Sequence, residues 1–417
     1  MSQTQQSSAR AWVSVIATAL FFFYWFIQLS LNNTLHDFYV AKFHIESYGL
    51  FTSMYLIGNV IMFIPAGMIL DKFSTKKVLC INVGIMILGA LGLLFAHNTF
   101  LAYACMLVVG CAGAFSLLAS LRIATTLFSA NKAGFPISVA ITLGMCGGLF
   151  GNSIGKILYD YFGSGASVQI VNIALGVVIL VLIVLGVKEA PKNTTGDRAD
   201  KPALSIFQAL AKVAKNPQNW LTGLYVSLLN LPIMILDFAF GQDYLKTIFH
   251  IEPLQAANTA SMIFIGFMVA GPFVGKWSDS WGYRKPLMIL GAIASLGVML
   301  LLYIPGLSYL WLMVIFFAIG VVTSAQNIGY PVIAESNDPT LTATANALGS
   351  ILIMGGGAIA QNIFGSIQST SGYSVAYHML PICMVIALLV ALAIKETGWK
   401  KKEPREKRNS GSISGGT

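Results

Sequence analysis

The sequence predicts an all-α membrane protein in which twelve transmembrane helices form two pseudo-symmetric six-helix bundles. Three observations support this fold class. First, 56% of the 417 residues are hydrophobic and 10% are charged, which is more apolar surface than a soluble protein of this length can bury. Second, apolar stretches of about 20 residues recur along the chain, and each can cross a bilayer core as a helix. Third, the two halves of the chain share a repeated pattern.

The repeat links two short segments that lie 208 residues apart. GMILDKFSTKK and GKWSDSWGYRK pair Gly67, Asp71, Lys76 and Lys77 with Gly275, Asp279, Arg284 and Lys285. Six spans in each half return the chain to its starting side, so both segments would face the same compartment. A membrane protein built from two similar halves is typically a transporter.

We predict spans over residues 11–36, 48–70, 77–96, 100–128, 135–158, 168–187, 218–242, 255–277, 285–305, 308–334, 343–367 and 375–395. The first is too long for a signal-peptide core and has no cleavage site behind it, so we expect it to remain as a membrane helix. The predicted organisation is a cytoplasmic N-terminus (1–10), a first bundle (11–188), a linker with an amphipathic helix (189–217), a second bundle (218–396) and a disordered basic tail (397–417).

The net charge of +9 is explained by membrane orientation rather than by nucleic-acid binding. With the N-terminus inside, most lysines and arginines fall in cytoplasmic segments, and only Lys42, Lys156 and Lys246 fall outside. This asymmetry follows the positive-inside rule. It predicts a multi-pass protein of the bacterial inner (plasma) membrane with both termini in the cytoplasm. The five cysteines all lie inside predicted spans, which indicates packing residues and no metal site.

The repeated segments and the twelve spans resemble the major facilitator superfamily, whose members carry G-x-x-x-D-[RK]-x-G-[RK]-[RK] between helices 2 and 3. The resemblance covers about residues 10–396. The first copy has Ser74 where the family usually has glycine, and the second has Ser280 in place of the first basic residue. The resemblance implies a secondary transporter whose two segments lie on the cytoplasmic side.

Elementary chemistry supports a gating role for these segments. Glycine permits close helix approach, and an aspartate at a helix end can accept hydrogen bonds from a neighbouring helix N-terminus or a basic side chain. Such contacts would form when the inner gate shuts and break when it opens. The predicted gating residues are Gly67, Asp71, Lys72, Lys76, Lys77, Gly275, Asp279, Arg284 and Lys285. The alternative is that the basic residues anchor the loops on anionic lipid.

A second resemblance lies in the fourth span, where Leu118 and Arg122 fit the family's L-x-x-x-R pattern, with Thr126 in place of a later glycine. An arginine inside a span is costly unless it faces protein or water. We therefore expect Arg122 to face the central cavity and to hold a carboxylate or phosphate of the solute, or to assist a proton-carrying acid. The alternatives are snorkelling to the cytoplasmic surface and a structural pair with an acid of the gate.

Further polar residues inside spans are candidates for solute binding. Tyr24, Gln28 and Asn32 recur every four residues and form one stripe on the first span. A buried amide needs a hydrogen-bonding partner, and a solute can be one. The other candidates are Asn152 and Asn362 at matching places in the fifth and eleventh spans, Asn230 in the seventh, and Gln326, Asn327 and Tyr330 in the tenth. Close helix packing is the alternative explanation for the glycine-rich segments around the two matched asparagines.

Asp237 is the only acidic residue well inside a predicted span, which makes it the candidate for proton coupling, because apolar surroundings favour a protonated carboxyl group. The alternative is that Asp237 lies near enough to the outer surface to be solvated. Pro232 in the same span is expected to kink the helix by freeing a backbone carbonyl. We expect His36, Asp37 and His378 to be solvated helix ends near the outer surface, with proton relay as the alternative.

These features favour a secondary active transporter that moves a small polar organic solute, such as an amino acid, nucleoside or organic acid, by alternating access with proton-coupled uptake. The runs FFFYWFIQLSLNN and PAGMILDKFST resemble bacterial intraphagosomal amino-acid and nucleoside importers of the superfamily. The alternatives are a non-transporting receptor and a proton-driven exporter of drugs or siderophores. The exporter is disfavoured because Asn152 replaces a proline of the family's drug antiporters.

No sequence motif points to an enzyme, since we find no GxxxxGK[ST] loop, no HExxH and no cluster of metal ligands. We expect no cofactor and a proton gradient as the energy source. The expected partners are the solute and the lipid bilayer, without nucleic acid, and the expected oligomeric state is a monomer.

Overall fold

The structure is a computed structural model that describes residues 8–128, 134–187, 206–338 and 341–398, and the regular structure in these ranges is helical. The first half contains α1 (Ser8–Thr34), α2 (His36–Phe43), α3 (Tyr48–Lys72), α4 (Thr75–Phe95), α5 (Thr99–Leu127), α6 (Gly134–Leu149), η1 (Phe150–Ile154), α7 (Gly155–Phe162) and α8 (Gly165–Gly186). The second half contains α9 (Ile206–Ala214), α10 (Pro217–Pro232), η2 (Ile233–Asp237), α11 (Gly241–Phe249), α12 (Pro253–Trp281), α13 (Lys285–Leu301), α14 (Tyr309–Thr323), η3 (Ser324–Ile328), α15 (Gly329–Glu335), α16 (Thr342–Tyr377) and α17 (Met379–Ala393).

The helices account for every predicted span. Within the described residues, nine helical stretches are long and apolar enough to cross a membrane, and α13 and α17 are shorter apolar helices. The segment α6–η1–α7 runs without a break from Gly134 to Phe162. The predicted all-α membrane fold class is therefore confirmed. The largest difference from the predicted boundaries concerns α16, which reaches Tyr377 and whose two parts are separated by Gly372 alone, at φ 83°.

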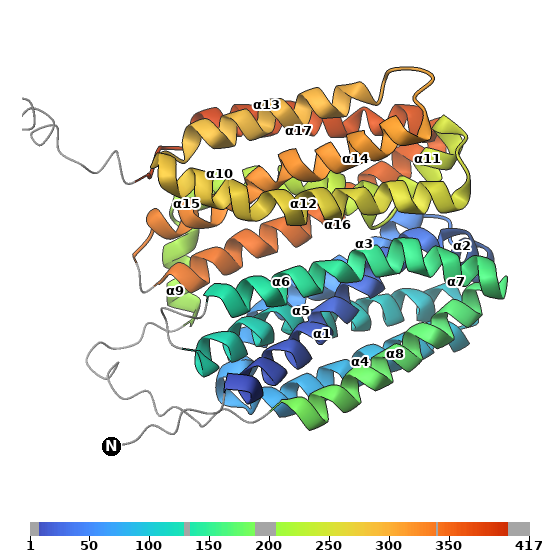
Figure 1. Ribbon diagram of the computed structural model, residues 1–417, viewed down its shortest axis with the longest axis horizontal. Coiled ribbons are helices and arrows are strands. Elements are labelled where there is room, and N and C mark those ends of the chain that lie inside the picture. Colours follow the sequence, from blue (N-terminus) through green and yellow to red (C-terminus); the bar gives the residue numbers. More distant parts are fainter. Residues whose placement is uncertain (1–7, 129–133, 188–205, 339–340, 399–417) are drawn as a thin grey trace, which may run out of the picture.

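The two halves form separate groups of helices, the first half below and the second half above in Figure 1. In the first half α3 packs on α5, α1 on α6 and α4 on α8; in the second half α12 packs on α14, α10 on α16 and α13 on α17. Each contact of the first half thus has its counterpart in the second. This correspondence is the pseudo-symmetry that the 208-residue repeat predicts.

The halves meet along two matched seams, where α3 packs on α16 and where α6 and η1 pack on α12. Glycines show how closely the helices approach. A Cβ atom at Gly49 would lie 2.1 Å from the main-chain oxygen of Gln361, and one at Gly365 would lie 2.9 Å from the Gly49 backbone. At Gly67 and Gly275, near the far ends of α3 and α12, a Cβ atom would meet nothing within 4 Å. The halves are therefore in tight contact at one end and apart at the other.

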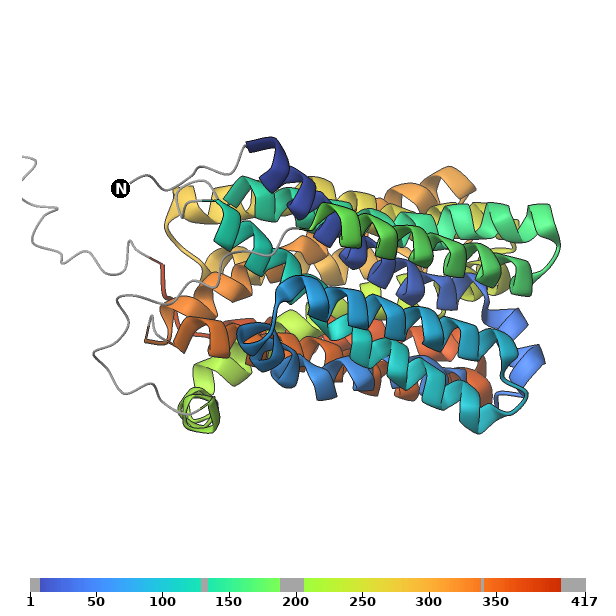
Figure 2. The ribbon, with the colours of Figure 1, turned by 90° about the horizontal axis from the view of Figure 1, so that it is seen from below.

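We call the end that carries α2, α7 and α11 the closed end, and the end that carries α9 and the first turns of α1 the open end (Figures 1 and 2). The close helix approach that the sequence predicted at Gly67 and Gly275 is absent in this conformation. The physical reason is that the helices of the two halves diverge toward the open end.

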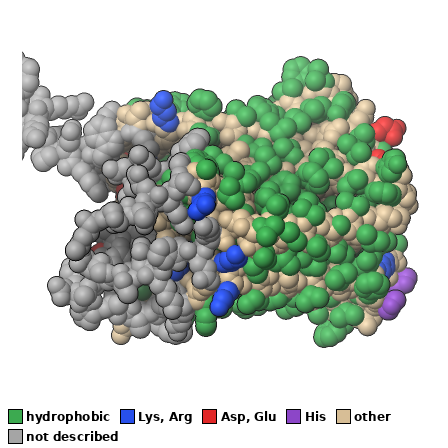
Figure 3. Space-filling model, turned by 60° about the horizontal axis from the view of Figure 1, so that its bottom comes forward, with side chains coloured by type: hydrophobic (Ala, Val, Ile, Leu, Met, Phe, Trp, Pro, Cys, Tyr) green, Lys and Arg blue, Asp and Glu red, His purple; other side chains and the backbone are tan. Residues whose placement is uncertain are grey.

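The outer surface fits a membrane environment. Hydrophobic side chains cover the middle of the face in Figure 3, while lysines and arginines gather toward its left, at the open end. Large apolar side chains such as Leu88, Phe100 and Leu185 are mostly exposed. A band of this kind is expected where helices contact hydrocarbon.

Parts of three sequence predictions lie outside the described residues, namely the N-terminus (1–7), most of the linker (188–205) and the basic tail (399–417). The described part of the linker forms α9, which packs on α16 and α10. Its Ala209 and Val213 are buried in a small apolar cluster with residues of α15 and α16.

Candidate functional site

Asp237 lies where the two halves meet, and its side chain is fully buried. Asn152 Nδ2 donates to Asp237 Oδ1 at 2.7 Å, and Ser30 Oγ donates to Oδ2 at 3.4 Å. Asn33 Nδ2 donates to the main-chain oxygen of Asp237 at 2.8 Å. All three donors are neutral and belong to the first half. The carboxyl group is therefore enclosed by the opposite half and does not reach solvent, in contrast to the alternative of a solvated side chain.

Gln242, at the start of α11, extends this contact. Its Nε2 donates to Asn152 Oδ1 at 3.0 Å and to Thr34 Oγ1 at 2.9 Å, and its main-chain N–H donates to Asn33 Oδ1 at 3.1 Å. Asn152 thus donates to Asp237 and accepts from Gln242, so both ends of its amide are used. We call these residues the interface network: Ser30, Asn33, Thr34, Asn152, Asp237 and Gln242.

Local sequence explains how Asp237 is placed. Proline has no N–H for the helical ladder, and α10 gives way at Pro232 to the π-helical turn η2, in which Phe238 N–H bonds to Ile233 O. The sequence predicts a kink at Pro232, and at this residue the helix changes from the α to the π form. Gly241 then begins α11 in a turn so tight that a Cβ atom there would lie 1.6 Å from Leu236 O.

Asn152 lies in the other π-helical turn, η1. Gly151 beside it packs against α1, where a Cβ atom would lie 2.7 Å from Ser30 Cβ. Single π-helical turns occur frequently at functional sites because they turn side chains away from the regular helical position. Here the two π-helical turns present Asn152 and Asp237 to each other across the interface.

The stripe predicted on the first span is buried, but it does not join the interface network. Gln28 Nε2 donates to Asn172 Oδ1 at 3.0 Å, and the Tyr24 ring packs beside Gly176, so both side chains face α8 within the first half. The hydroxyl of Tyr24 and Nδ2 of Asn32 are buried without a hydrogen-bonding partner among the described residues. Their role as solute ligands stays a prediction.

The other solute-binding candidates of the second half lie on several elements. Asn230 of α10 and Gln326 of η3 are buried, and Nε2 of Gln326 has no partner among the described residues. Asn327 faces α12, where a Cβ atom at Gly271 would lie 3.2 Å from its Nδ2. Tyr330 of α15 is half-buried.

Asn362 and Arg122 lie apart from these residues. Asn362 lines a groove of about 420 Å³ between α3 and α16. Arg122 of α5 is half-buried, one turn from the C-terminal end of its helix, and its main-chain oxygen accepts a hydrogen bond from Thr126 at 2.7 Å. Of the predicted solute ligands, Asn152 is the one that the structure brings into hydrogen-bonding contact with Asp237.

The second gate segment makes charged contacts within its own half. The Arg284 guanidinium bonds to Glu335 Oε1 at 2.9 Å. Glu396 accepts hydrogen bonds from the main-chain N–H groups of Arg284 and Lys285, at 2.8 and 3.0 Å, and so caps α13. The sequence assigned such a contact with a helix N-terminus to Asp279, whose side chain lies outside the described atoms. Glu396 and Glu335 were not among the predicted gating residues.

The first gate segment differs from the second at its turn. Ser74 Oγ accepts a hydrogen bond from Lys77 N–H at 3.4 Å and begins α4, whereas Gly282 at the matched position ends α12 with φ 74°. Serine is a favoured N-cap, and glycine tolerates the left-handed region. Lys76 is half-buried and Lys77 is exposed. The side chains of Asp71 and Lys72 lie outside the described atoms, and the gating role of this segment stays a prediction.

Sequence reasoning missed four members of the interface network: Ser30, Asn33, Thr34 and Gln242. The repeat held the signal, because Thr34 and Gln242 are 208 residues apart and are bonded to each other. When a two-fold pseudo-axis relates two halves, matched positions close to the axis meet. Polar residues at matched positions of the first and seventh spans could therefore have been predicted to meet at the interface.

Comparisons with known proteins agree with this architecture. A profile of the Major Facilitator Superfamily matches residues 12–361 and again residues 231–415. Among solved structures, the chain is similar to a bacterial homolog of the human lysosomal transporter Spinster in an inward-facing and unoccupied conformation, with 16% sequence identity and a TM-score of 0.67 over 93% of this chain and 96% of that chain.

The chain is also similar to a mutant of the nucleoside transporter NupG, with 15% identity and a TM-score of 0.71 over 92% of this chain and 99% of that chain. A comparison with curated proteins found no match. At these low identities the solved structures support the fold alone. Taken with the family profile, the matched helix pairs and the internal repeat, they show that the chain belongs to the Major Facilitator Superfamily of transporters.

Proposed function

We propose that the chain is a proton-coupled secondary transporter that takes up a small polar organic solute across the bacterial inner membrane by alternating access. One observation carries the proposal: a carboxyl group of the second half, Asp237, is buried against Asn152 and Ser30 of the first half. Around this contact the halves touch at the closed end and are apart at the open end. A transporter that works by alternating access needs this conformation, closed at one end and open at the other, and a second conformation in which the two ends are exchanged.

The distribution of charge supports an orientation. Lysines Lys42, Lys156 and Lys246 lie on α2, α7 and α11 at the closed end, whereas the gate segments and α9 place many more basic residues at the open end. The positive-inside rule then assigns the open end to the cytoplasm. In this orientation the described conformation faces inward, and both termini are cytoplasmic.

The surroundings of Asp237 suit a group that gains and loses a proton. Its hydrogen-bonding partners are neutral, and burial of an unpaired charge is costly. A protonated carboxyl group avoids this cost, because its O–H can donate to Ser30 Oγ while Oδ1 still accepts from Asn152. When the closed end opens, water replaces both partners and the proton can exchange. Opening and closing would thus be linked to protonation of Asp237.

The solute class is inferred from two buried amides without hydrogen-bonding partners among the described residues and from the charge of one arginine. The amides of Asn32 and Gln326 each keep a buried N–H₂ group without a partner among the described residues, and Arg122 adds a positive charge. Such groups suit an amino acid, nucleoside or organic acid better than an apolar drug. The similarity to a nucleoside transporter is a reason to include nucleosides among the solutes tested.

The second candidate function is proton-driven export of drugs or siderophores. The interface network argues against it, because Asn152 makes hydrogen bonds to Asp237 and from Gln242 that the antiporters' proline could not make. A non-transporting receptor is the remaining alternative.

Transport by purified protein in proteoliposomes tests the proposal. We expect an inward proton gradient to drive accumulation of at least one amino acid, nucleoside or organic acid, and Asp237→Asn to abolish accumulation while solute exchange continues. Asp160→Asn is the matched control, because Asp160 is exposed and pairs with Lys156 on its own helix. Absence of counterflow with every solute would refute uptake, and normal accumulation by Asp237→Asn would exclude Asp237 as the proton carrier.

A further inference from the structure

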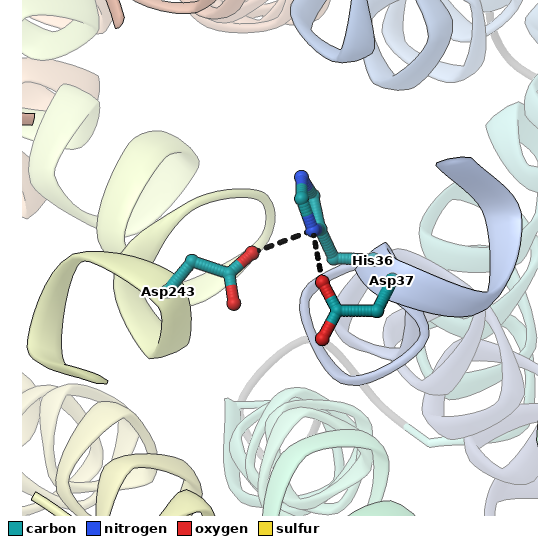
Figure 4. A group of neighbouring side chains, drawn as sticks. All are labelled: His36, Asp37 and Asp243. Atoms are coloured by element: carbon teal, nitrogen blue, oxygen red, sulfur yellow. Dashed lines mark hydrogen bonds and ion pairs between the residues drawn. The ribbon is translucent and has the colours of Figure 1, made fainter. Parts of the chain in front are cut away.

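A cluster of charged side chains joins the two halves at the closed end, outside the membrane spans (Figure 4). His36 begins α2 in the first half, and Asp243 lies on α11 in the second. His36 Nδ1 is 2.7 Å from Asp243 Oδ2 and 2.9 Å from Asp37 Oδ1. Lys246 Nζ is 2.5 Å from Asp243 Oδ1 and 3.6 Å from Asp37 Oδ2. The cluster is therefore an ionic contact between α2 and α11.

The geometry around His36 requires a hydrogen on Nδ1 and favours a positive charge on the imidazole. Both neighbours of Nδ1 are carboxylate oxygens, which only accept hydrogen bonds, so Nδ1 carries the hydrogen. This N–H can point at one oxygen at a time, and Asp243 Oδ2 is buried with no other hydrogen-bonding partner among the described residues. Two carboxylates beside one lysine leave one negative charge unbalanced. A positive charge on His36 balances it.

We propose that His36 is a proton-binding site that fastens α2 to α11, so that closing this end of the molecule takes up one proton. The inference rests on the proposed function in one respect, because it treats the closed end as a gate. The same three side chains of His36, Asp37 and Asp243 lie close enough to chelate a metal ion. Lys246 already bonds to one of the carboxylates, however, so the charge balance favours a proton.

The charges around His36 support this assignment. Burial lowers the pKa of His36, but hydrogen bonds to Asp243 and Asp37 and their negative charges outweigh burial and raise the pKa from 6.5 to about 9. The hydrogen bond from His36 lowers the pKa of Asp37 to about 2. Burial lowers the pKa of Lys246, yet the charges of Asp243 and Asp37 and the hydrogen bonds to them together outweigh burial and raise this pKa above its ordinary value. Asp37 and Lys246 therefore stay charged while His36 titrates.

The remaining elements around the cluster contribute tyrosines. The Tyr48 ring of α3 lies edge-on to the imidazole of His36, with ring centroids 4.2 Å apart. Tyr373 of α16 lies near both carboxylates. Neither side chain supplies a positive charge that could replace the proton on His36.

The direction of the pH effect follows from these pKa values. When the closed end opens, His36 loses Asp243, and its pKa returns toward the ordinary 6.5. Stabilisation of the closed form by the proton is complete below about pH 6.5 and is lost as the pH rises through about 9. The rise in the pKa of His36 from 6.5 to about 9 corresponds to a roughly 300-fold change in the ratio of closed to open forms. This value is an upper limit, because His36 keeps Asp37 as a neighbour in the open form.

Pulsed electron–electron double resonance, which measures the distance between two spin labels, tests the inference directly. Spin labels on the exposed residues Ala41 of α2 and Thr247 of α11 report the opening of the closed end. The labels are introduced as non-canonical amino acids, because the chain has five cysteines of its own. Measurement without solute or gradient, in an Asp237→Asn background, removes the contribution of the proposed proton carrier. We expect the closed population to fall as the pH rises from 6 to 9.5.

Substitutions at two histidines of the closed end, His36 and His378, distinguish the proposed proton site from the alternatives. His36→Gln should remove the pH dependence, and His36→Lys should keep the closed end shut over the whole range. His378→Gln is the matched control and should keep the parent's pH profile, since His378 is exposed and its Nδ1 bonds to main-chain oxygens of its own helix. An unchanged profile in His36→Gln would overturn the proposal, and so would closure that requires added Zn²⁺ or disappears with a chelator.

Folding and transport are controlled separately. His36→Gln should remain monodisperse and unfold at the parent's temperature at pH 9.5, where His36 of the parent is already largely neutral. If transport fails for every solute but closure still depends on His36, the proposed function is wrong and the proton site stands. If transport succeeds and closure does not depend on His36, the reverse holds.

Discussion

Alanine at Gly49 should weaken the closed end, because no space exists there for a methyl group. Gly49 lies in the first turn of α3, where a Cβ atom would be 2.1 Å from Gln361 O and 3.2 Å from Asn362 Cα. Both neighbours are backbone atoms of α16, so a change of side-chain rotamer cannot relieve the clash. Non-bonded heavy atoms are most stable at about 3.5–4.0 Å, so α3 and α16 would have to separate by roughly 1.5 Å.

The size of the effect follows from the cost of overpacking. Insertion of a methyl group into a well-packed contact costs about 1–3 kcal/mol, which corresponds to a roughly 5- to 150-fold loss in the ratio of closed to open forms. In the conformation in which the closed end has opened, α3 and α16 are apart at Gly49, so the substitution does not destabilise that conformation. The substitution should therefore shift the conformational equilibrium rather than unfold the protein.

Gly84→Ala on α4 is the matched control, because a Cβ atom there would meet nothing within 4 Å and Gly84 belongs to neither gate segment. Both substitutions gain the same intrinsic helix propensity of about 1 kcal/mol, so their difference isolates the contact with α16. Spin labels at Ala41 and Thr247, measured at pH 6, should show a larger open population for Gly49→Ala than for Gly84→Ala. Equal populations in the two variants would refute the argument that Gly49 holds the closed end.

Two further predictions concern single hydrogen-bonding residues. Asn152→Ala removes the donor 2.7 Å from Asp237 Oδ1 and should destabilise the closed end by about 1–3 kcal/mol, which the same spin labels would report as an increased open population; an unchanged population would show that the bond contributes nothing. Glu396→Gln weakens the cap on the N-terminus of α13 and should lower the unfolding temperature, at a cost of about 1 kcal/mol, whereas the exposed Glu46→Gln should not; equal unfolding temperatures would contradict the capping role.

The fold could be predicted from the sequence because a membrane permits few backbone structures. Backbone groups in hydrocarbon must bond internally, so each apolar stretch can be predicted as a helix. The repeat then relates the two halves, and the packing of α3 on α5 and of α12 on α14 follows from one and the same pattern. The effect of Pro232 could also be expected, because a proline in mid-span lacks the N–H of the helical ladder, and α10 gives way there to a π-helical turn.

The interface was predicted less completely, because periodicity gives the spacing of a polar stripe but not its direction. Gln28 belongs to a regular stripe and turns inward to Asn172, while Asn33 lies outside that stripe and faces Asp237. The π-helical turns η1 and η2 also shift the registers of Asn152 and Asp237. No regular helical wheel reproduces those positions. Glu396 was missed for another reason, since its contact with Arg284 spans 112 residues of sequence.

The central claim is that the two halves separate at the closed end, breaking the contact at Asp237, as they come together at the open end. It is tested most directly by measuring both ends of one protein, with one pair of spin labels at Ala41 and Thr247 and another at Leu185 and Leu392, which are exposed on α8 and α17 toward the open end. We predict that conditions that open the first pair, such as Gly49→Ala or high pH, shorten the distance between the second pair. Distances that change at one end alone, or that lengthen at both ends together, would contradict alternating access in this protein.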